Sequence, residues 1–170
     1  MEVLEMDNLI EQLVKRNNTF DMTLKKVGLI LATIVVSVVS LMIPVNSSFA
    51  ILLIAGMIAL DVFLFNRMNI EYEYVFFNGS LDIDRIANKA SRKRLYSTNL
   101  KEAVIVAPTG TQELLGYQHV KVKDFSTHTP GNKTYEMVVP QGAEKIRIIF
   151  EPNEEMLQAM RDIAPRKVIL

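Results

Sequence analysis

The chain has 170 residues with 19 basic and 19 acidic side chains, so its formal net charge is zero. A neutral balance gives no support to nucleic-acid binding, which usually needs a basic face. The absence of cysteine excludes disulfide bonds and thiolate metal sites. Hydrophobic residues make up 49% of the chain, and their excess lies between residues 27 and 65. The composition therefore predicts an apolar segment that is distinct from the rest of the chain.

Residues 1–18 precede this apolar segment and carry hydrophobic residues at helical spacing. One face of a helix drawn over residues 3–16 would hold Val3, Met6, Leu9, Ile10 and Leu13. The opposite face is mainly acidic, whereas a helix that lies on a membrane usually has a basic polar face. We therefore expect an amphipathic helix that packs on the folded domain or on a partner.

Residues 19–67 contain two apolar runs, at residues 27–43 and 49–65, joined by the loop PVNSS. Each run has seventeen residues and would span ~25 Å as a helix, close to the ~30 Å hydrocarbon core of a bilayer. A hairpin buried inside a soluble domain is the alternative. Two adjacent runs of this length favour a two-helix transmembrane hairpin.

Positive charges flank the two runs on one side only. Lys15, Arg16, Lys25 and Lys26 precede the first run and Arg67 follows the second, whereas the connecting loop has no charge. Lys and Arg are enriched on the cytoplasmic side of membrane helices. We therefore expect a two-pass protein of the cell (inner) membrane with both termini in the cytoplasm.

Asp61 is the only ionisable residue within either run. Ionisable residues inside membranes are functional candidates, but Asp61 lies only four residues from the end of its run. We expect it to reach the lipid headgroups or to pair with Lys25, Lys26 or Arg67. A proton-carrying or ion-carrying role is the less favoured interpretation.

Small residues recur at a spacing of four in both runs, as Gly28 and Ala32 and as Ala55 and Ala59. This spacing allows two helices to approach closely. Packing within the hairpin is the simpler interpretation, and a homodimer formed through these residues is the alternative.

Residues 68–170 show short alternating runs separated by turn residues, a pattern typical of an all-β domain. A helix is predicted at residues 153–164, where apolar residues recur on one face and a proline ends the pattern. We expect seven strands before this helix, at residues 70–77, 80–87, 92–97, 102–107, 118–125, 134–139 and 144–150.

The first two predicted strands are joined by Asn78-Gly79, a strong signal for a two-residue hairpin turn. In that register one face is apolar, with Tyr72, Tyr74, Phe76, Leu81 and Ile83, and the other gathers four carboxylates, Glu71, Glu73, Asp82 and Asp84. Facing like charges cost stability, so a counter-charge is expected. Ion pairs with Arg92, Lys93 and Arg94 of the next strand are favoured, and a divalent metal is the alternative.

Six basic residues follow the hairpin closely: Arg85, Lys89, Arg92, Lys93, Arg94 and Lys101. Such a run is usually a solvated face, and contact with anionic inner-leaflet lipids is the alternative. The sequence contains no metal-ligand spacing, no arrangement around a nucleophile and no phosphate-binding loop. We therefore expect neither catalysis nor a cofactor.

The order of seven antiparallel strands and a C-terminal helix resembles the pleckstrin-homology (PH) superfold. A membrane hairpin leading into such a domain is similar to bacterial PH-like membrane proteins. The segments EYEYVFFNGSLDIDRI, RKRLYS and EPNEEMLQAMRDIAPRKV also resemble a small Gram-positive, clostridial-type family whose members supply no activity to carry over. The resemblance implies a membrane α-hairpin followed by an all-β barrel or sandwich capped by its last helix.

The resemblance also implies a function in binding or scaffolding. The PH superfold often holds peptides in the groove between its C-terminal helix and the neighbouring strands, so we expect a protein or peptide partner. The basic cluster that phosphoinositide-binding members carry around the first hairpin loop is missing here, since residues 77–80 have no positive charge. That lipid site is not implied.

Overall fold

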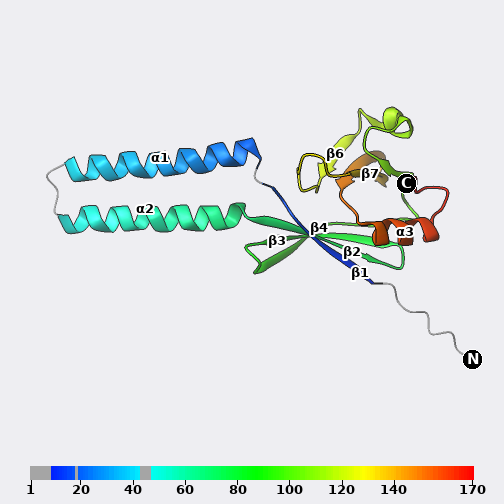
Figure 1. Cartoon of the computed structure of the whole chain (residues 1–170), viewed down its shortest axis with the longest axis horizontal. Coiled ribbons are helices and arrows are strands. Elements are labelled where there is room, and N and C mark those ends of the chain that lie inside the picture. Colours follow the sequence, from blue (N-terminus) through cyan, green and yellow to red (C-terminus); the bar gives the residue numbers. More distant parts are fainter. Residues whose placement is uncertain (1–8, 18, 43–46) are drawn as a thin grey trace, which may run out of the picture. The chain divides into compact units, whose positions relative to one another are not determined.

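A computed structural model describes residues 9–17, 19–42 and 47–170 of the chain (Figure 1). The chain forms two compact units. One is a helical hairpin within residues 18–70, and the other combines the residues up to Asn17 with Glu71–Leu170.

The hairpin consists of two helices, α1 (Phe20–Met42) and α2 (Ser47–Met68), which lie side by side (Figure 1). Both are long and apolar enough to cross a membrane, and both extend beyond the predicted runs. One stripe of each helix is covered by the other, with residues at intervals of three or four: Met22, Lys26, Leu29, Thr33, Val36 and Ser40 in α1, and Ala50, Leu53, Met57, Asp61, Leu64 and Met68 in α2. Most of the other large apolar side chains are exposed.

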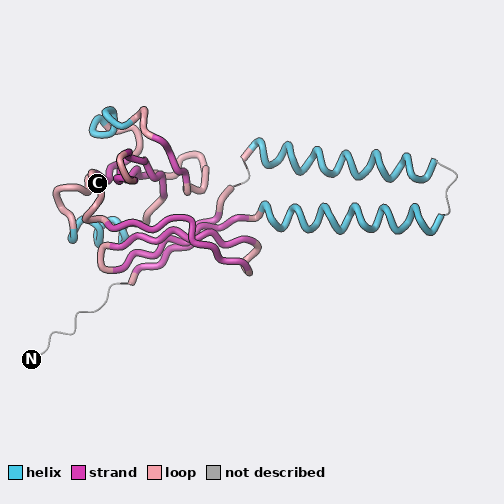
Figure 2. The backbone as a smooth tube through the Cα atoms, turned by 180° about the vertical axis from the view of Figure 1, so that it is seen from behind, coloured by secondary structure: helices cyan, strands magenta, loops and turns pink. Residues whose placement is uncertain are grey.

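The first sheet of the domain has the order β1-β2-β3-β4. Figure 2 shows the strands of the domain in magenta. Its strands are β1 (Ile10–Lys15), β2 (Ile70–Phe77), β3 (Ser80–Ala87) and β4 (Ser91–Asn99). β1 and β2 pair antiparallel, from Ile10 opposite Phe76 to Lys15 opposite Glu71. The helical hairpin is therefore inserted between two neighbouring strands of one sheet.

The amphipathic helix expected over residues 3–16 is wrong where the chain is described, because Ile10–Lys15 is a strand. Residues 3–8 lie outside the described residues. Ile10 and Val14 are buried while Glu11, Leu13 and Lys15 are exposed, which is the alternation of a strand. Pairing with β2 supplies backbone hydrogen bonds, and this tertiary contact overrides the helical spacing.

The second sheet has the order β5-β7-β8-β6. Its strands are β5 (Ile105–Pro108), β6 (Lys121–Asp124), β7 (Tyr135–Gln141) and β8 (Glu144–Phe150), with the 3-10 helix η1 (Gln112–Tyr117) between β5 and β6. β6 pairs parallel with β8. The expected seven-stranded antiparallel barrel is thus corrected to two four-stranded sheets, with eight strands among the described residues.

The predicted strand bounds differ in accuracy. Residues 70–77, 80–87 and 144–150 are strands with the expected limits, whereas those expected at 102–107 and 118–125 are shorter. The chain turns before β5, where the amide of Glu102 donates to the carbonyl of Asn99.

The core combines side chains from both sheets with one face of α3 (Glu154–Ile163). The five residues predicted on the apolar face of the first hairpin are all buried, and the Tyr74 ring packs edge-on against Phe150. The buried inner face of α3 consists of Met156, Leu157 and Met160. Asn153 caps this helix, because its side chain accepts a hydrogen bond from the amide of Met156 at 2.8 Å.

Candidate functional sites

Two arginines of β4 pair with three of the four acids of the first hairpin, as predicted, whereas the expected pairing through Lys93 is not among the ion pairs of the described residues. Arg92 forms an ion pair with Glu73 and a second with Asp84, at 2.8 Å between Nε and Oδ2. Arg94 pairs with Asp82 and with Asp84, each at 3.1 Å. The Asp84 residue is only 4% exposed, whereas the side chains of Arg92 and Arg94 are 53% and 56% exposed, so the arginines cover the acid and face the solvent themselves.

A β-bulge aligns the two arginines with the acids. The register between β3 and β4 shifts at Ile83/Asp84, so that Asp84 lies opposite Arg94 and Ile86 opposite Arg92. The hydrogen bond from Arg94 to Asp84, together with the charges of Asp82 and Asp84, raises the pKa of Arg94. Among the described residues no group of three or more His, Asp or Glu is placed to hold a metal ion. The structure therefore gives no support to the metal alternative.

The six basic candidates do not act as one group. Arg92 and Arg94 are used in the acidic cluster. Lys101 follows the far end of β4, and its carbonyl accepts a hydrogen bond from Lys167 Nζ at 2.6 Å. Arg85, Lys89 and Lys93 lie around the turn between β3 and β4, and within the described part of the chain none of them forms an ion pair with an acid.

A groove lies between α3, the start of β7 and the last residues of the chain. One cavity of about 390 Å³ and another of about 410 Å³ share Lys133, Tyr135 and Leu170. The first is completed by Pro152, Glu154, Leu157 and Gln158, and the second by Pro108, Thr109, Asn132 and Thr134. Apolar and polar groups line both in similar amounts, which is an arrangement suited to a peptide.

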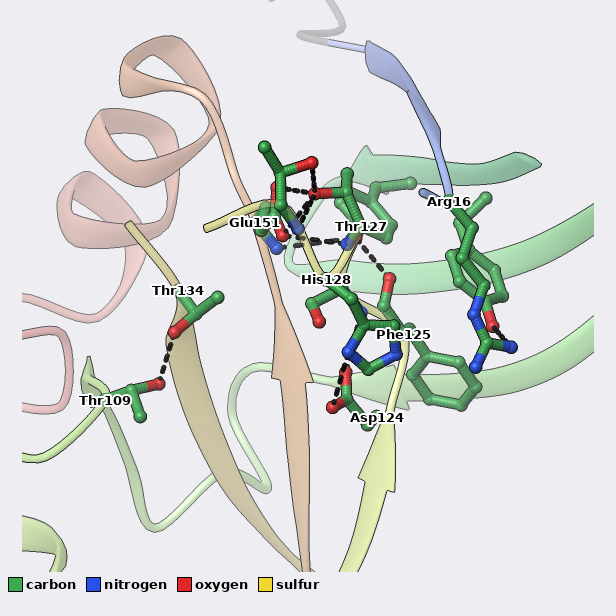
Figure 3. Close-up of polar contacts among 12 residues, drawn as sticks. Arg16, Thr109, Asp124, Phe125, Thr127, His128, Thr134 and Glu151 are labelled. Carbon is green, nitrogen blue, oxygen red and sulfur yellow. Dashed lines mark hydrogen bonds and ion pairs between the residues drawn. The ribbon is translucent and has the colours of Figure 1, made fainter. Parts of the chain in front are cut away.

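Hydrogen bonds hold the walls of this groove (Figure 3). The buried carboxylate of Glu151 accepts hydrogen bonds from the amide of Thr127 and its hydroxyl, each at 2.8 Å, and from Asn132 Nδ2 at 2.9 Å. On the other side Thr134 Oγ1 donates to Thr109 Oγ1 at 2.8 Å. The groove is therefore preorganised by its surroundings.

The same network reaches β1 and the residue that follows it. Asn17 donates its amide to the carbonyl of Thr127 at 2.7 Å, and Gln12 Nε2 donates to the carbonyl of Glu151 at 2.8 Å. No local sequence pattern indicates these two contacts, because Gln12 and Asn17 are each more than a hundred residues from their partners along the chain.

Asp61 is held within the hairpin by a polar contact between the two helices. Its carboxylate accepts a hydrogen bond from Thr33 Oγ1 at 2.7 Å. Asp61 is buried where α2 contacts α1. It lies seven residues before the end of α2, because this helix continues beyond the predicted run. The Arg67 guanidinium lies 4.7 Å from the ring centroid of Phe63.

The small residues of the hairpin do not form its internal contact. Gly28, Ala32, Ala55 and Ala59 are all exposed, so the expected packing through them within the hairpin is wrong. A homodimer through these residues stays a prediction.

Comparison with known proteins gives one match. The sequence profile of the family described as "Bacterial PH-like domain (DUF6106)" matches residues 6–170, which include the helical hairpin and both sheets. Neither the curated proteins nor the solved structures contain a match.

Proposed function

Because this chain belongs to the bacterial PH-like domain family, we propose that it is a membrane-anchored binding module that holds a peptide segment of a protein partner. The groove beside α3 is the observation that carries this proposal. PH-like domains are generally non-catalytic, and we extend that property to this chain.

The chemistry of the groove favours an extended peptide. Tyr135 and Leu157 offer apolar contact, and Leu170 remains half exposed at the junction of the two cavities. Lys133 and Gln158 add polar groups at the rim. Binding sites of this kind combine apolar contact with a few oriented polar groups, so an apolar side chain flanked by polar backbone would fit.

The helical hairpin supports the membrane part of the proposal. Large apolar side chains such as Leu31, Val35 and Leu52 lie outside the stripe where α1 and α2 touch. A bilayer would cover these outer faces, whereas water would not. The distribution of Lys and Arg then favours a two-pass arrangement with the binding domain in the cytoplasm.

Site-specific photocrosslinking in cells that express the full chain tests the groove. A photoreactive amino acid at Gln158, which lines the groove, should give a discrete adduct with a partner, whereas the same residue at the exposed Glu144, at the start of β8, should not.

A pair of matched variants decides whether the adduct depends on the groove. Leu170→Asp should abolish the adduct because it places a charge where both cavities meet, and Leu115→Asp should leave it intact. Both leucines are exposed, so neither change should unfold the domain. An adduct that forms equally at Glu144, or that survives Leu170→Asp, would contradict the proposal.

A further inference from the structure

An aromatic cluster lies at the end of the first sheet where β1 ends and β2 begins. The Tyr72 and Phe125 ring centroids are 5.8 Å apart in an edge-on contact, and Tyr96 follows at 6.5 Å from Phe125. Arg16 donates from Nη1 to the Tyr72 hydroxyl at 3.4 Å, beside Phe125 (Figure 3). Lys123 Nζ lies 4.5 Å from the ring centroid of Tyr96. Two cations from distant segments therefore meet the same cluster.

Strands β3 and β4 bring two more cations to this end. β2 ends at Phe77 and β3 begins at Ser80, so the two-residue turn pairs these residues, and the register continued along the strands places Tyr72 opposite Arg85. The same register places Glu73 opposite Asp84, and the ion pairs of Arg92 with both of these acids are consistent with it. Lys93 lies directly opposite Arg85.

These four cations have no acidic partner in the described part of the chain. The Nε atoms of Arg16 and Arg85 are buried without a hydrogen-bond partner there. Asp124 is next to Lys123 in sequence, but its carboxylate accepts the amide of Ser126 at 2.9 Å and faces His128 at 3.7 Å. A buried donor of a charged group left unpaired is costly.

Three other arginines of the two sheets differ because they meet carboxylates, although the Nε of Arg147 is also buried without a hydrogen-bond partner among the described residues. Arg92 and Arg94 meet the acids of the first hairpin, and Arg147 Nη1 lies 2.9 Å from Glu136 Oε2. The domain therefore pairs guanidinium groups with carboxylates on both sheets but leaves this end of the first sheet positive. An external anion would neutralise these cations.

We propose that Arg16, Arg85, Lys93 and Lys123 form a binding site for the phosphate group of an anionic membrane lipid. Guanidinium groups suit phosphate because their N–H groups bind its oxygens in pairs. The lipid is the favoured source because Arg16 is four residues from the start of α1 and Tyr72 is four residues from the end of α2. Four residues span at most about 14 Å, so the site stays close to both helix ends. This site is separate from the groove and does not depend on a peptide partner.

Amide hydrogen exchange of the full chain in lipid nanodiscs tests the site. With phosphatidylglycerol at roughly one lipid in four, we expect slower exchange around residues 14–16, 71–73, 84–94 and 121–126 than in pure phosphatidylcholine. Each cation contributes about a fivefold factor in affinity, so Arg85→Gln with Lys93→Gln should weaken phosphatidylglycerol binding roughly 30-fold and remove the protection.

Two controls make each outcome decisive. Arg161→Gln with Arg166→Gln removes the same charge at exposed positions in and after α3, and it should leave the protection intact. The single exposed change Lys93→Gln should give a partial loss even if the double variant fails to fold. Protection that is absent with phosphatidylglycerol, or lost equally in the control variant, would overturn the proposal. Protection by inorganic phosphate in phosphatidylcholine nanodiscs, without an effect of phosphatidylglycerol, would overturn the lipid as its source.

Discussion

At the scale of single residues, the burial of Tyr74 makes the stability of the domain depend on pH. Its ring is fully buried, and its hydroxyl donates to the carbonyl of Phe125 at 2.6 Å. Burial raises the pKa of the Tyr74 phenol far above its ordinary value, and the hydrogen bond at the Glu151 backbone offsets only part of this shift. The folded state therefore holds the proton in alkaline solution.

We predict that the domain loses stability as the pH rises above about 10. Below that pH the phenol is protonated in both states and contributes no pH dependence. Above it the unfolded chain releases the proton of Tyr74 while the folded chain keeps it, so the free energy of unfolding falls by about 1.4 kcal/mol per pH unit. Denaturant titrations of the full chain in detergent at several alkaline pH values measure this slope.

The variant Tyr74→Phe should lower stability near neutral pH by about 1 kcal/mol, because the carbonyl of Phe125 loses its donor. It should also reduce the alkaline slope by one proton. Tyr117→Phe in η1 is the matched control for the loss of a tyrosine hydroxyl. An unchanged slope in Tyr74→Phe would show that another group causes the alkaline loss.

At the scale of elements, β1 connects the segment before the helical hairpin to the segment after it, because it pairs with β2. It buries Ile10 and Val14 against the core, and its last residue Lys15 is the pairing partner of Glu71. Burying two such side chains contributes about 3–6 kcal/mol, a large share of the roughly 5–15 kcal/mol that stabilises a domain. Without β1, strand β2 would become an exposed edge.

We predict that residues 70–170 alone do not form a stable domain. Residues 1–17 joined to residues 70–170 by a short Gly-Ser linker should fold as a soluble monomer, because Lys15 and Glu71 lie side by side. Size-exclusion chromatography and thermal melting by circular dichroism compare the two proteins. A cooperative melt of residues 70–170 at the same temperature as the joined protein would contradict the assigned role of β1.

The elements also show what could be predicted from the sequence. β2 and β3 have their expected bounds because Asn78-Gly79 and the alternation of apolar residues are local signals. The ion pairs of Asp82 and Asp84 were predictable for the same reason, since β4 follows directly. β1 was not, because its partner lies beyond the hairpin and a few apolar residues fit a helix as well as a strand. The parallel partner of β6 and the Glu151 network also depend on contacts between distant segments.

At the scale of the whole molecule, the central question is on which side of a membrane each part lies. The proposed binding groove and the proposed phosphate site both belong to the unit that begins before the hairpin and resumes after it. If α1 and α2 cross a membrane as proposed, the pairing of β1 with β2 in one sheet requires both ends of the hairpin to emerge on the same side. The proposed even number of crossings then has a support that is independent of the charge distribution.

The chain contains no cysteine, so single cysteines can report topology directly. We predict that a membrane-impermeant maleimide labels Ser47→Cys in intact cells, because the proposed topology places the start of α2 on the outer side of the membrane. Glu11→Cys in β1 and Glu155→Cys in α3 are exposed on the folded domain and should be labelled only after the cells are permeabilised. Labelling of Glu11→Cys and Glu155→Cys in intact cells, with Ser47→Cys protected, would invert the assigned topology. Because Glu11 and Glu155 belong to one compact unit, unequal labelling of these two positions would contradict the shared sheet and not only its orientation.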